Sequence, residues 1–242
     1  MKIKFIIKNF KKLVSTNIYA KRRINLLNSG DVIVAKEQIS GKGRFERKWH
    51  SPPGGLYFSM ILKKIDLRYL NSINYIFLLS VIETLKNENN INSAFKWPND
   101  LMLNSKKFGG LLAETFNINE NAFDIILGCG INLNIDKFPK DLQNISTSVF
   151  LEKKIKLNTS DFLKKLLKLF NNNFDTYGKN NLSYLLKKVT FHCETIGKMV
   201  KIQYNKEIFE GKAVSLNKNF TLSIKFESGD IKDFFSCDKL IQ

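Results

Sequence analysis

The stretch from residue 41 to residue 49 has the composition of an anion-binding loop. Gly41 and Gly43 alternate with Lys42 and Arg44, and two further cations precede Trp49. Glycine lets a backbone approach a ligand closely and adopt dihedral angles closed to other residues, and the cations can neutralise a phosphate or a carboxylate. A solvated basic surface loop or an RNA contact uses the same residue types, so this segment alone leaves those interpretations open.

Four other segments carry polar side chains, and two of them also contain paired or alternating glycines. They are Ser15-Thr16-Asn17 followed by Gln38, Lys96-Trp97-Pro98-Asn99-Asp100, Lys107-Phe108-Gly109-Gly110-Leu111-Leu112-Ala113-Glu114, and Gly128-Cys129-Gly130-Ile131-Asn132-Leu133-Asn134. With the basic loop, they resemble the sequence blocks of biotin protein ligases and occur in that family's order. The family's loop is usually written Gly-Arg-Gly-Arg-x-x-Arg-x-Trp. The resemblance is clear from residue 15 to 134 and weaker toward the C-terminus.

The resemblance implies an ATP-dependent ligase with biotin and ATP as substrates and Mg²⁺ as the accompanying ion. Biotin would be activated as biotinyl-5′-AMP and transferred to a lysine of a biotin carboxyl carrier domain. The implied fold class is α+β: a catalytic domain at 1–192, with helices on a mixed sheet as in class II aminoacyl-tRNA synthetases, and an SH3-like barrel at 193–242.

The resemblance also implies roles for individual residues, with Lys107 and Arg44 as the catalytic cations. Lys107 would bridge the biotin carboxylate and the α-phosphate, and the planar fork of Arg44 suits phosphate oxygens. The biotin-binding residues would be Ser15, Thr16, Asn17, Gln38, Lys42, Gly43, Arg44 and Lys107. The residues for ATP or the adenylate would be Gly41, Trp49, Lys96, Asn99, Asp100 and Asn132.

Several of these assignments keep an alternative. Asp100 could orient Mg²⁺ through water, with the ion held mainly by ATP phosphates, or could simply cap a turn. Trp49 could cover a ligand face or belong to the core, and Ser15 to Asn17 could form a helix N-cap. Lys42 stands where the family usually has arginine. This substitution matters little if residue 42 binds the ligand through its backbone amide, and we favour that interpretation. Phe45 and Glu46 replace the family's common Arg-Gly pair, so a looser loop could release the adenylate faster.

Length and composition set the outer limits. The 242 residues suit one large domain, or one plus a small module, and 43% hydrophobic content supports a core. No apolar run is long enough for a membrane span, and the basic segment Met1 to Lys12 is expected to be a first strand or helix rather than a signal peptide. Cys129, Cys193 and Cys237 lack metal-ligand spacing, which suits reduced thiols in a cytoplasm. The net charge of +17 is attributed to a biased composition rather than to nucleic-acid binding, although it could attract an acidic partner.

Hydrophobic periodicity predicts the elements that would position these residues. Strands are expected at 31–37, 55–62 and 94–97, a buried helix at 71–88, and paired strands at 107–116 and 122–127, with a further strand or turn at 128–134. A helix capped by Ser160 would bury a stripe of aromatic and aliphatic side chains and end at Gly178; the stripe is Phe162, Leu166, Phe170 and Phe174. A short helix at 182–188 and short strands at 198–204, 206–215, 220–226 and 231–235 would follow, with a domain boundary near 190–195.

Three functions remain to be separated. Fourteen residues precede Ser15, too few for a helix-turn-helix of about 20 residues. We therefore expect a monofunctional biotin ligase with no DNA partner. We also expect no membrane partner, and we leave a homodimer open. A lipoate or octanoate ligase would share the fold but handle an acyl chain without a ureido ring. A basic RNA-binding module would lose affinity steeply with salt and turn over no ATP.

Overall fold

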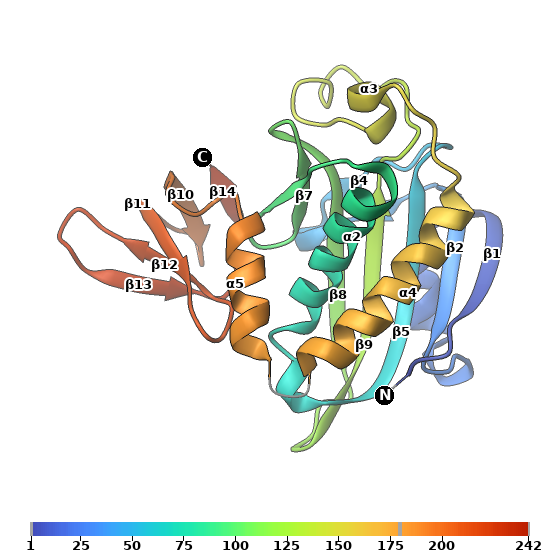
Figure 1. Cartoon of the computed structure of the whole chain (residues 1–242), viewed down its shortest axis with the longest axis horizontal. Coiled ribbons are helices and arrows are strands. Elements are labelled where there is room, and N and C mark those ends of the chain that lie inside the picture. The colour runs from blue at the N-terminus through green and yellow to red at the C-terminus, as the bar shows by residue number, and fades with distance from the viewer. Residues whose placement is uncertain (1, 179–180, 242) are drawn as a thin grey trace.

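A computed structural model of the chain describes residues 2–178 and 181–241. Its centre is a seven-stranded sheet in the order β1-β2-β5-β9-β8-β7-β6 (Figure 1). β1 and β2 are parallel and the remaining neighbours are antiparallel, which makes the sheet mixed. The strands are β1 (Ile6–Leu13), β2 (Asp31–Gln38), β5 (Leu56–Asp66), β6 (Ala94–Lys96), β7 (Asp100–Leu103), β8 (Lys106–Phe116) and β9 (Ala122–Ile131).

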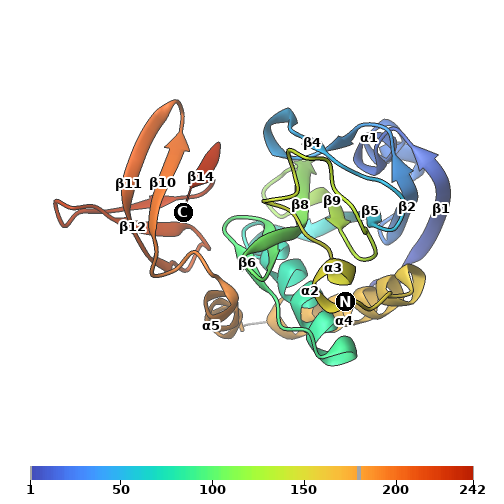
Figure 2. The same cartoon turned by 90° about the horizontal axis from the view of Figure 1, so that it is seen from above.

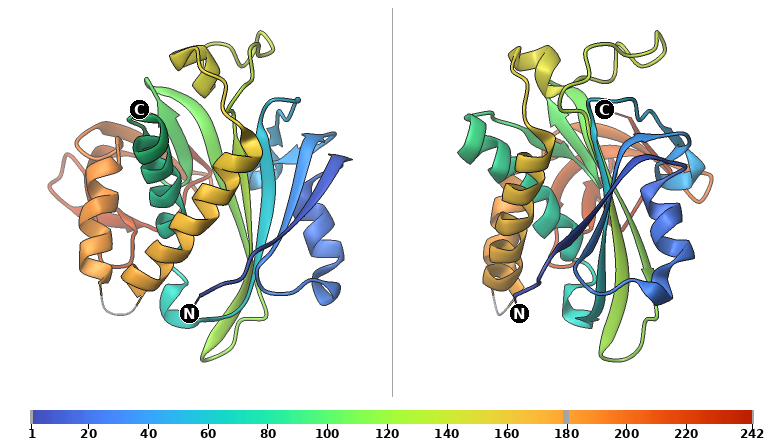
Figure 3. Two further views of the ribbon diagram at one scale, coloured as in Figure 1. Left: turned by 45° about the vertical axis from the view of Figure 1, so that its right-hand side comes forward. Right: turned by 90° about the vertical axis from the view of Figure 1, so that its right-hand side faces the viewer.

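Helices cover both faces of this sheet (Figure 3). Successive side chains of a strand point to opposite faces. Met60 therefore joins the large core beneath α2 and α4, whereas its neighbour Ile61 joins a smaller core beneath α1. Because the central strands are covered on both faces, their sequences are almost continuously apolar. The helices are α1 (Thr16–Arg22), α2 (Ile73–Asn89), α3 (Val149–Lys153), α4 (Thr159–Gly178) and α5 (Leu182–His192).

The long helices confirm the periodicity argument, with one correction at a terminus. α2 buries residues on most of its circumference, and the four stripe residues of α4 are buried. The side chain of Asn158 accepts hydrogen bonds from the amides of Ser160 and Asp161, both at 3.0 Å. The prediction of Ser160 as the cap was therefore wrong, because an asparagine just before the helix satisfies those first free amides.

Two local predictions in the central sheet were also wrong. β9 continues through Gly128 to Ile131, so the segment after residue 127 extends the same strand instead of forming a separate strand or turn. Asp100 begins β7 and pairs with Gly110 of β8. The order Pro98-Asn99-Asp100 predicts a turn that includes Asp100, whereas only Trp97 to Asn99 turn between β6 and β7.

The C-terminal segment forms a second, five-stranded antiparallel sheet in the order β13-β12-β11-β10-β14, beside the central sheet (Figure 2). The four expected strands are confirmed and β14 is additional. Within 2–178 and 181–241, β13 and β14 are the two edge strands and are not paired with each other, so the strand pairing is that of an open antiparallel sheet. Tyr75 of α2 connects the two sheets: its ring stacks on Phe220 at 5.0 Å and its hydroxyl donates to the Phe220 carbonyl at 3.1 Å. The strands are β10 (Met199–Tyr204), β11 (Glu207–Leu216), β12 (Leu222–Lys225), β13 (Ile231–Phe234) and β14 (Lys239–Ile241).

Candidate functional site

A cavity of about 530 Å³ lies where the basic loop, the ends of β8 and β9, and the C-terminal segment meet. All but one of the site residues predicted from the sequence line this cavity: Ser15, Thr16, Asn17, Gln38, Lys42, Gly43, Arg44, Trp49, Lys96, Asn99, Asp100, Lys107 and Asn132. Gly41 is the exception. Segments more than a hundred residues apart in sequence therefore line one concave surface, the usual setting of a ligand site.

The basic loop is a small hairpin of β3 (Gly41–Lys42) and β4 (Lys48–Trp49) around a 3₁₀ turn. A Cβ at residue 41 would lie 2.6 Å from both the Ser51 hydroxyl and the Trp49 carbonyl, so Gly41 allows close packing beneath the loop instead of lining the cavity. The left-handed residues of the loop are Phe45 (φ 53°) and Glu46 (φ 58°), not the glycines. The expectation that glycines supply unusual dihedral angles here was therefore wrong.

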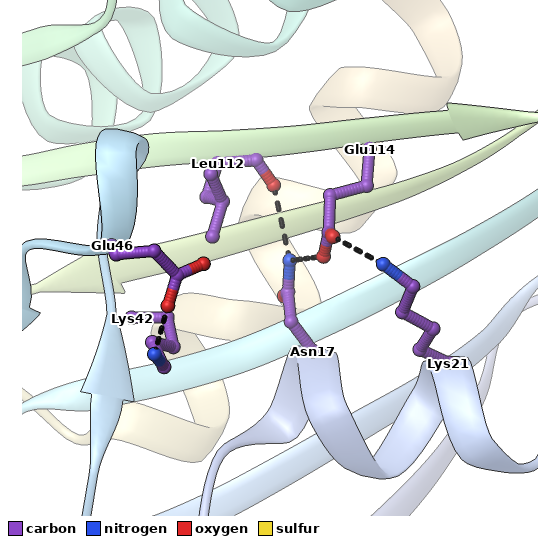
Figure 4. Close-up of polar contacts among 6 residues, drawn as sticks. All are labelled: Asn17, Lys21, Lys42, Glu46, Leu112 and Glu114. Atoms are coloured by element: carbon purple, nitrogen blue, oxygen red, sulfur yellow. Dashed lines mark hydrogen bonds and ion pairs between the residues drawn. The ribbon is translucent and has the colours of Figure 1, made fainter.

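Lys42 is engaged within this hairpin. Its ammonium pairs with the exposed Glu46 carboxylate, four residues along the chain (Figure 4). The side chain that replaces the family's arginine is therefore committed to a local partner, which agrees with a contribution from its backbone.

Arg44 reaches across the cavity to two neutral acceptors. Its guanidinium donates to Asn99 Oδ1 at 3.2 Å and to the Cys237 carbonyl at 3.3 Å, and burial lowers the pKa of the guanidinium from its ordinary value. Arg47 similarly donates to the carbonyl of Asp238. Neutral acceptors do not cancel the charge of an arginine, so the guanidinium of Arg44 keeps its positive charge available to bind an anion in the cavity.

Lys107 provides a second cation, and its backbone is fixed on both sides. Its amide donates to the Ile145 carbonyl at 3.0 Å, and its own carbonyl accepts from the amide of Thr147 at 2.9 Å. The ammonium lies 2.6 Å from Asp100 Oδ1 and 5.1 Å from the centre of the Trp49 ring. Lys96 lies nearby, and burial lowers the pKa of its ammonium.

Gly130 of β9 makes room for Trp49, whereas its partner across the strands, Gly110 of β8, does not have to be a glycine for this packing. Gly110 faces Gly130 in the strand register. A Cβ at residue 130 would lie 2.4 Å from the Trp49 indole nitrogen, whereas the nearest contact of one at residue 110 would be Lys107 Cε at 3.4 Å. The indole therefore rests on bare backbone, next to the catalytic candidate Lys107.

The other end of the cavity is a hydrogen-bonded polar cluster around the start of α1. Gln38 accepts from the amide of Thr16 at 2.8 Å through Oε1 and donates to the Ser51 hydroxyl at 2.9 Å through Nε2. The buried Ser59 hydroxyl contacts the hydroxyl of Thr16 at 2.7 Å and the side-chain oxygen of Asn17. Ser15 occupies the N-cap position of α1, but its hydroxyl makes no capping hydrogen bond.

Three buried polar atoms that belong to cavity-lining residues have no hydrogen-bond partner within 2–178 and 181–241. They are the indole nitrogens of Trp49 and Trp97, which are donors, and Oδ1 of Asn132, an acceptor. The amide nitrogen of Asn132 is satisfied by the Thr147 carbonyl at 3.0 Å. A buried polar atom without a partner is destabilising, so the unpaired atoms of Trp49 and Asn132 suit contact with a ligand.

Two parts of the cavity lining give no signal in the sequence. One is an apolar wall from the connection after β9, contributed by Phe138, Leu142 and Ile145. The other is the segment from Cys237 to Leu240. Neither carries a polar motif or a periodicity that separates it from an ordinary loop, and only the tertiary fold brings them to the site.

The described part of the chain contains no group of three or more histidine, cysteine, aspartate or glutamate residues arranged to hold a metal ion. Over the same residues, no helix combines the length and apolarity that crossing a membrane requires.

Comparison with known proteins gives concordant matches. The model of the biotin/lipoate A/B protein ligase family matches residues 10–132. The bifunctional ligase/repressor BirA of Bacillus spizizenii is 28% identical over 213 residues, which cover 86% of this chain and 65% of that relative. The biotin–[acetyl-CoA-carboxylase] ligase of Paracoccus denitrificans is 28% identical over 122 residues, 49% of this chain and 51% of that relative. The biotin protein ligase of Aquifex aeolicus, solved in complex with biotin and ATP, superposes with a TM-score of 0.84 at 27% identity and 98% coverage of both chains.

Proposed function

The chain belongs to the biotin/lipoate A/B protein ligase family, and from that premise we propose that it activates biotin with ATP and transfers it to a lysine of an acceptor protein. In the first step a carboxylate oxygen of biotin attacks the α-phosphorus of ATP, the bond to the β-phosphate breaks, and pyrophosphate leaves. In the second step a lysine amine attacks the carbonyl carbon of biotinyl-5′-AMP, AMP leaves, and the amine loses a proton as the amide forms.

The observation that carries this proposal is the division of the cavity into a neutral polar end and a cationic end. Thr16, Asn17 and Gln38 form the neutral end, which suits a cyclic urea because a buried urea needs matched donors and acceptors. Lys107 and Arg44 mark the cationic end, where two anions must approach each other.

Lys107 and Arg44 then divide the work of the first step. Lys107 neutralises the biotin carboxylate and the α-phosphate as they meet, exchanging its contact with Asp100 for one with the ligand. Arg44 holds phosphate oxygens from the other wall, against Asn99. A well-placed donor of this kind contributes a factor of about 10²–10³ to the rate.

Asn132 contributes to nucleotide binding through its unpaired Oδ1. That atom can only accept a hydrogen bond, so its partner on ATP is a donor, either the exocyclic amine of adenine or a ribose hydroxyl. The apolar wall of Phe138, Leu142 and Ile145 provides a surface for the flat face of the base.

Mg²⁺ would reach the site on the phosphates of ATP. Asp100 is the acidic residue of the cavity nearest to Lys107, and its carboxylate is already paired with that ammonium at 2.6 Å. The chain's own carboxylates therefore fit a resident metal poorly, and any contact of Asp100 with Mg²⁺ would be through water.

Further parts of the proposal concern partners and organisation. The acceptor is a domain that exposes a biotin-accepting lysine, and the excess of positive charge would attract an acidic one. Two expectations stay predictions: the division into a catalytic domain at 1–192 and a C-terminal module of SH3-like type at 193–242, and a cytoplasmic location. A homodimer stays open.

Isothermal titration with biotin, lipoate and octanoate separates the two ligase activities of the family. A site that hydrogen-bonds the ureido group should reject a ligand without it by about 10⁴-fold. We expect strong biotin binding and no measurable lipoate or octanoate binding. Lipoate binding as tight as that of biotin would overturn the proposal in favour of a lipoate ligase.

A further inference from the structure

Glu114 lies outside the cavity lining but next to a residue that lines it. Its carboxylate accepts from Nδ2 of Asn17 at 3.0 Å and from the ammonium of Lys21 at 3.1 Å (Figure 4). The second proton of Asn17 Nδ2 goes to the carbonyl of Leu112 at 3.3 Å. Both partners of this amide nitrogen can only accept hydrogen bonds, so they determine which way the Asn17 amide faces.

The volume around Asn17 strengthens that constraint. A Cβ at residue 128 would lie 2.1 Å from Oδ1 of Asn17, so the amide oxygen occupies the space left by Gly128 on β9. Asn17 is thus held between β5, β8 and β9 and is 5% exposed.

The direction of the Asn17 amide determines the direction of the hydrogen bonds beyond it. Oδ1 can only accept, so Ser59 must donate its single proton to Asn17. The 2.7 Å contact between Ser59 and Thr16 then takes the hydroxyl proton of Thr16, in preference to the longer contact of 3.3 Å with Gln38 Oε1. Asn17 and Thr16 consequently have only lone pairs left for a ligand.

We propose that Glu114 is a specificity-determining positioning residue, which fixes the Asn17–Ser59–Thr16 chain so that this end of the cavity presents two hydrogen-bond acceptors. Two acceptors match the two N–H donors of a cyclic urea. With the Asn17 amide reversed, Ser59 would donate to Thr16, Thr16 would donate to Gln38 Oε1 at 3.3 Å, and Asn17 would present an N–H donor in place of its acceptor. This inference rests on the proposed function and assigns the polarity of its biotin pocket to a side chain that does not touch the ligand.

Glutamine at position 114 tests the claim because it keeps the shape and removes the obligate acceptor. The Lys21 ammonium can only donate, so in Glu114→Gln it draws the new amide oxygen and leaves the amide nitrogen facing Asn17. Two donors then meet, and Asn17 must reverse or lose its partner. Removing Lys21 as well frees the glutamine oxygen to face Asn17 and restores the original direction.

The experiment measures biotin affinity by titration, and kcat and KM for biotin by pyrophosphate release, in wild type, Glu114→Gln, Lys21→Ala and the double variant. We expect Glu114→Gln to weaken biotin binding and raise KM by about tenfold, the order of one lost hydrogen bond, with kcat at saturating biotin within about twofold. Lys21→Ala should resemble wild type, and the double variant should recover to within about threefold of it.

Glu83 on α2 is a matched control because it makes the same bridge away from the cavity. Its carboxylate accepts from Asn173 Nδ2 at 2.8 Å and from the Lys188 ammonium at 2.8 Å. Glu83→Gln should lower thermal stability without changing KM for biotin, which separates positioning from a general loss of stability.

The outcomes distinguish this inference from the proposed function. Normal biotin binding by Glu114→Gln, or a double variant as weak as the single one, would overturn the role of Glu114 while leaving the ligase activity in place. A wild-type protein that binds no biotin would overturn both.

Discussion

Replacement of Lys107 by alanine should abolish most adenylation while leaving biotin binding largely intact. The ammonium lies 2.6 Å from Asp100 Oδ1, so its removal takes away one positive charge and also leaves a carboxylate uncompensated where two further anions must meet. Loss of one positioned donor lowers the rate by a factor of about 10²–10³. The uncompensated charge of Asp100 lowers the rate further. We expect biotin-dependent pyrophosphate release to fall by at least about 10²-fold, with biotin affinity within about tenfold of wild type because the polar end of the cavity is unchanged.

Two companion variants make this prediction specific. Lys106 is the adjacent lysine and its ammonium donates to the Gln143 carbonyl at 3.5 Å, so Lys106→Ala should keep near-normal turnover. Lys107→Ala combined with Asp100→Asn should recover about tenfold of the lost rate, because the uncompensated carboxylate is removed. Near-normal pyrophosphate release from Lys107→Ala would remove Lys107 from the mechanism, and an equal loss in Lys106→Ala would mean that local folding was being measured.

Three further predictions concern the loop and its support. Gly130→Ala should displace Trp49, because the indole nitrogen would lie 2.4 Å from the new Cβ. We expect a red shift of the tryptophan fluorescence and a loss of stability of about 1–3 kcal/mol. Gly110→Ala, whose new Cβ has no contact below 3.4 Å, should change neither the spectrum nor the stability, and identical spectra for the two variants would refute this packing. Trypsin should cut the ligand-free protein after Lys42, Arg44 or Arg47, and biotin with ATP should protect these bonds because anions order the loop; equal cleavage in both states would contradict this. Lys42→Arg should leave the dissociation rate of biotinyl-AMP nearly unchanged, since Lys42 pairs with Glu46 inside the loop; a several-fold slower release would show that the side chain holds the intermediate.

The residues that carry charge or hydrogen bonds were predictable because their types and order are unusual. Lys107, Arg44, Gln38 and Asn132 come from distant segments, and the structure places them around one cavity. The buried stripe of α4 was equally predictable, because apolar side chains repeated every four residues are typical of a helix that packs one face against a core. The roles of the site residues stay predictions until they are tested.

Other features depended on contacts that a linear sequence does not contain. The role of Gly41 follows from its distance to Ser51 and Trp49, and the left-handed residues Phe45 and Glu46 give no sign of their conformation in their side chains. The part of Glu114 in orienting Asn17 joins residues 97 positions apart. Such effects arise from tertiary contacts, which the local conformational propensity of a residue does not predict.

The central claim is that this cavity makes biotinyl-5′-AMP. The most direct test is mass spectrometry of the purified protein after incubation with biotin and MgATP, with parallel samples that lack biotin or contain lipoate. We predict biotinyl-AMP and pyrophosphate only when biotin is present, and biotin on the lysine of a carrier domain once that domain is added. Formation of lipoyl-AMP in place of biotinyl-AMP, or no adenylate with either acid, would contradict the account.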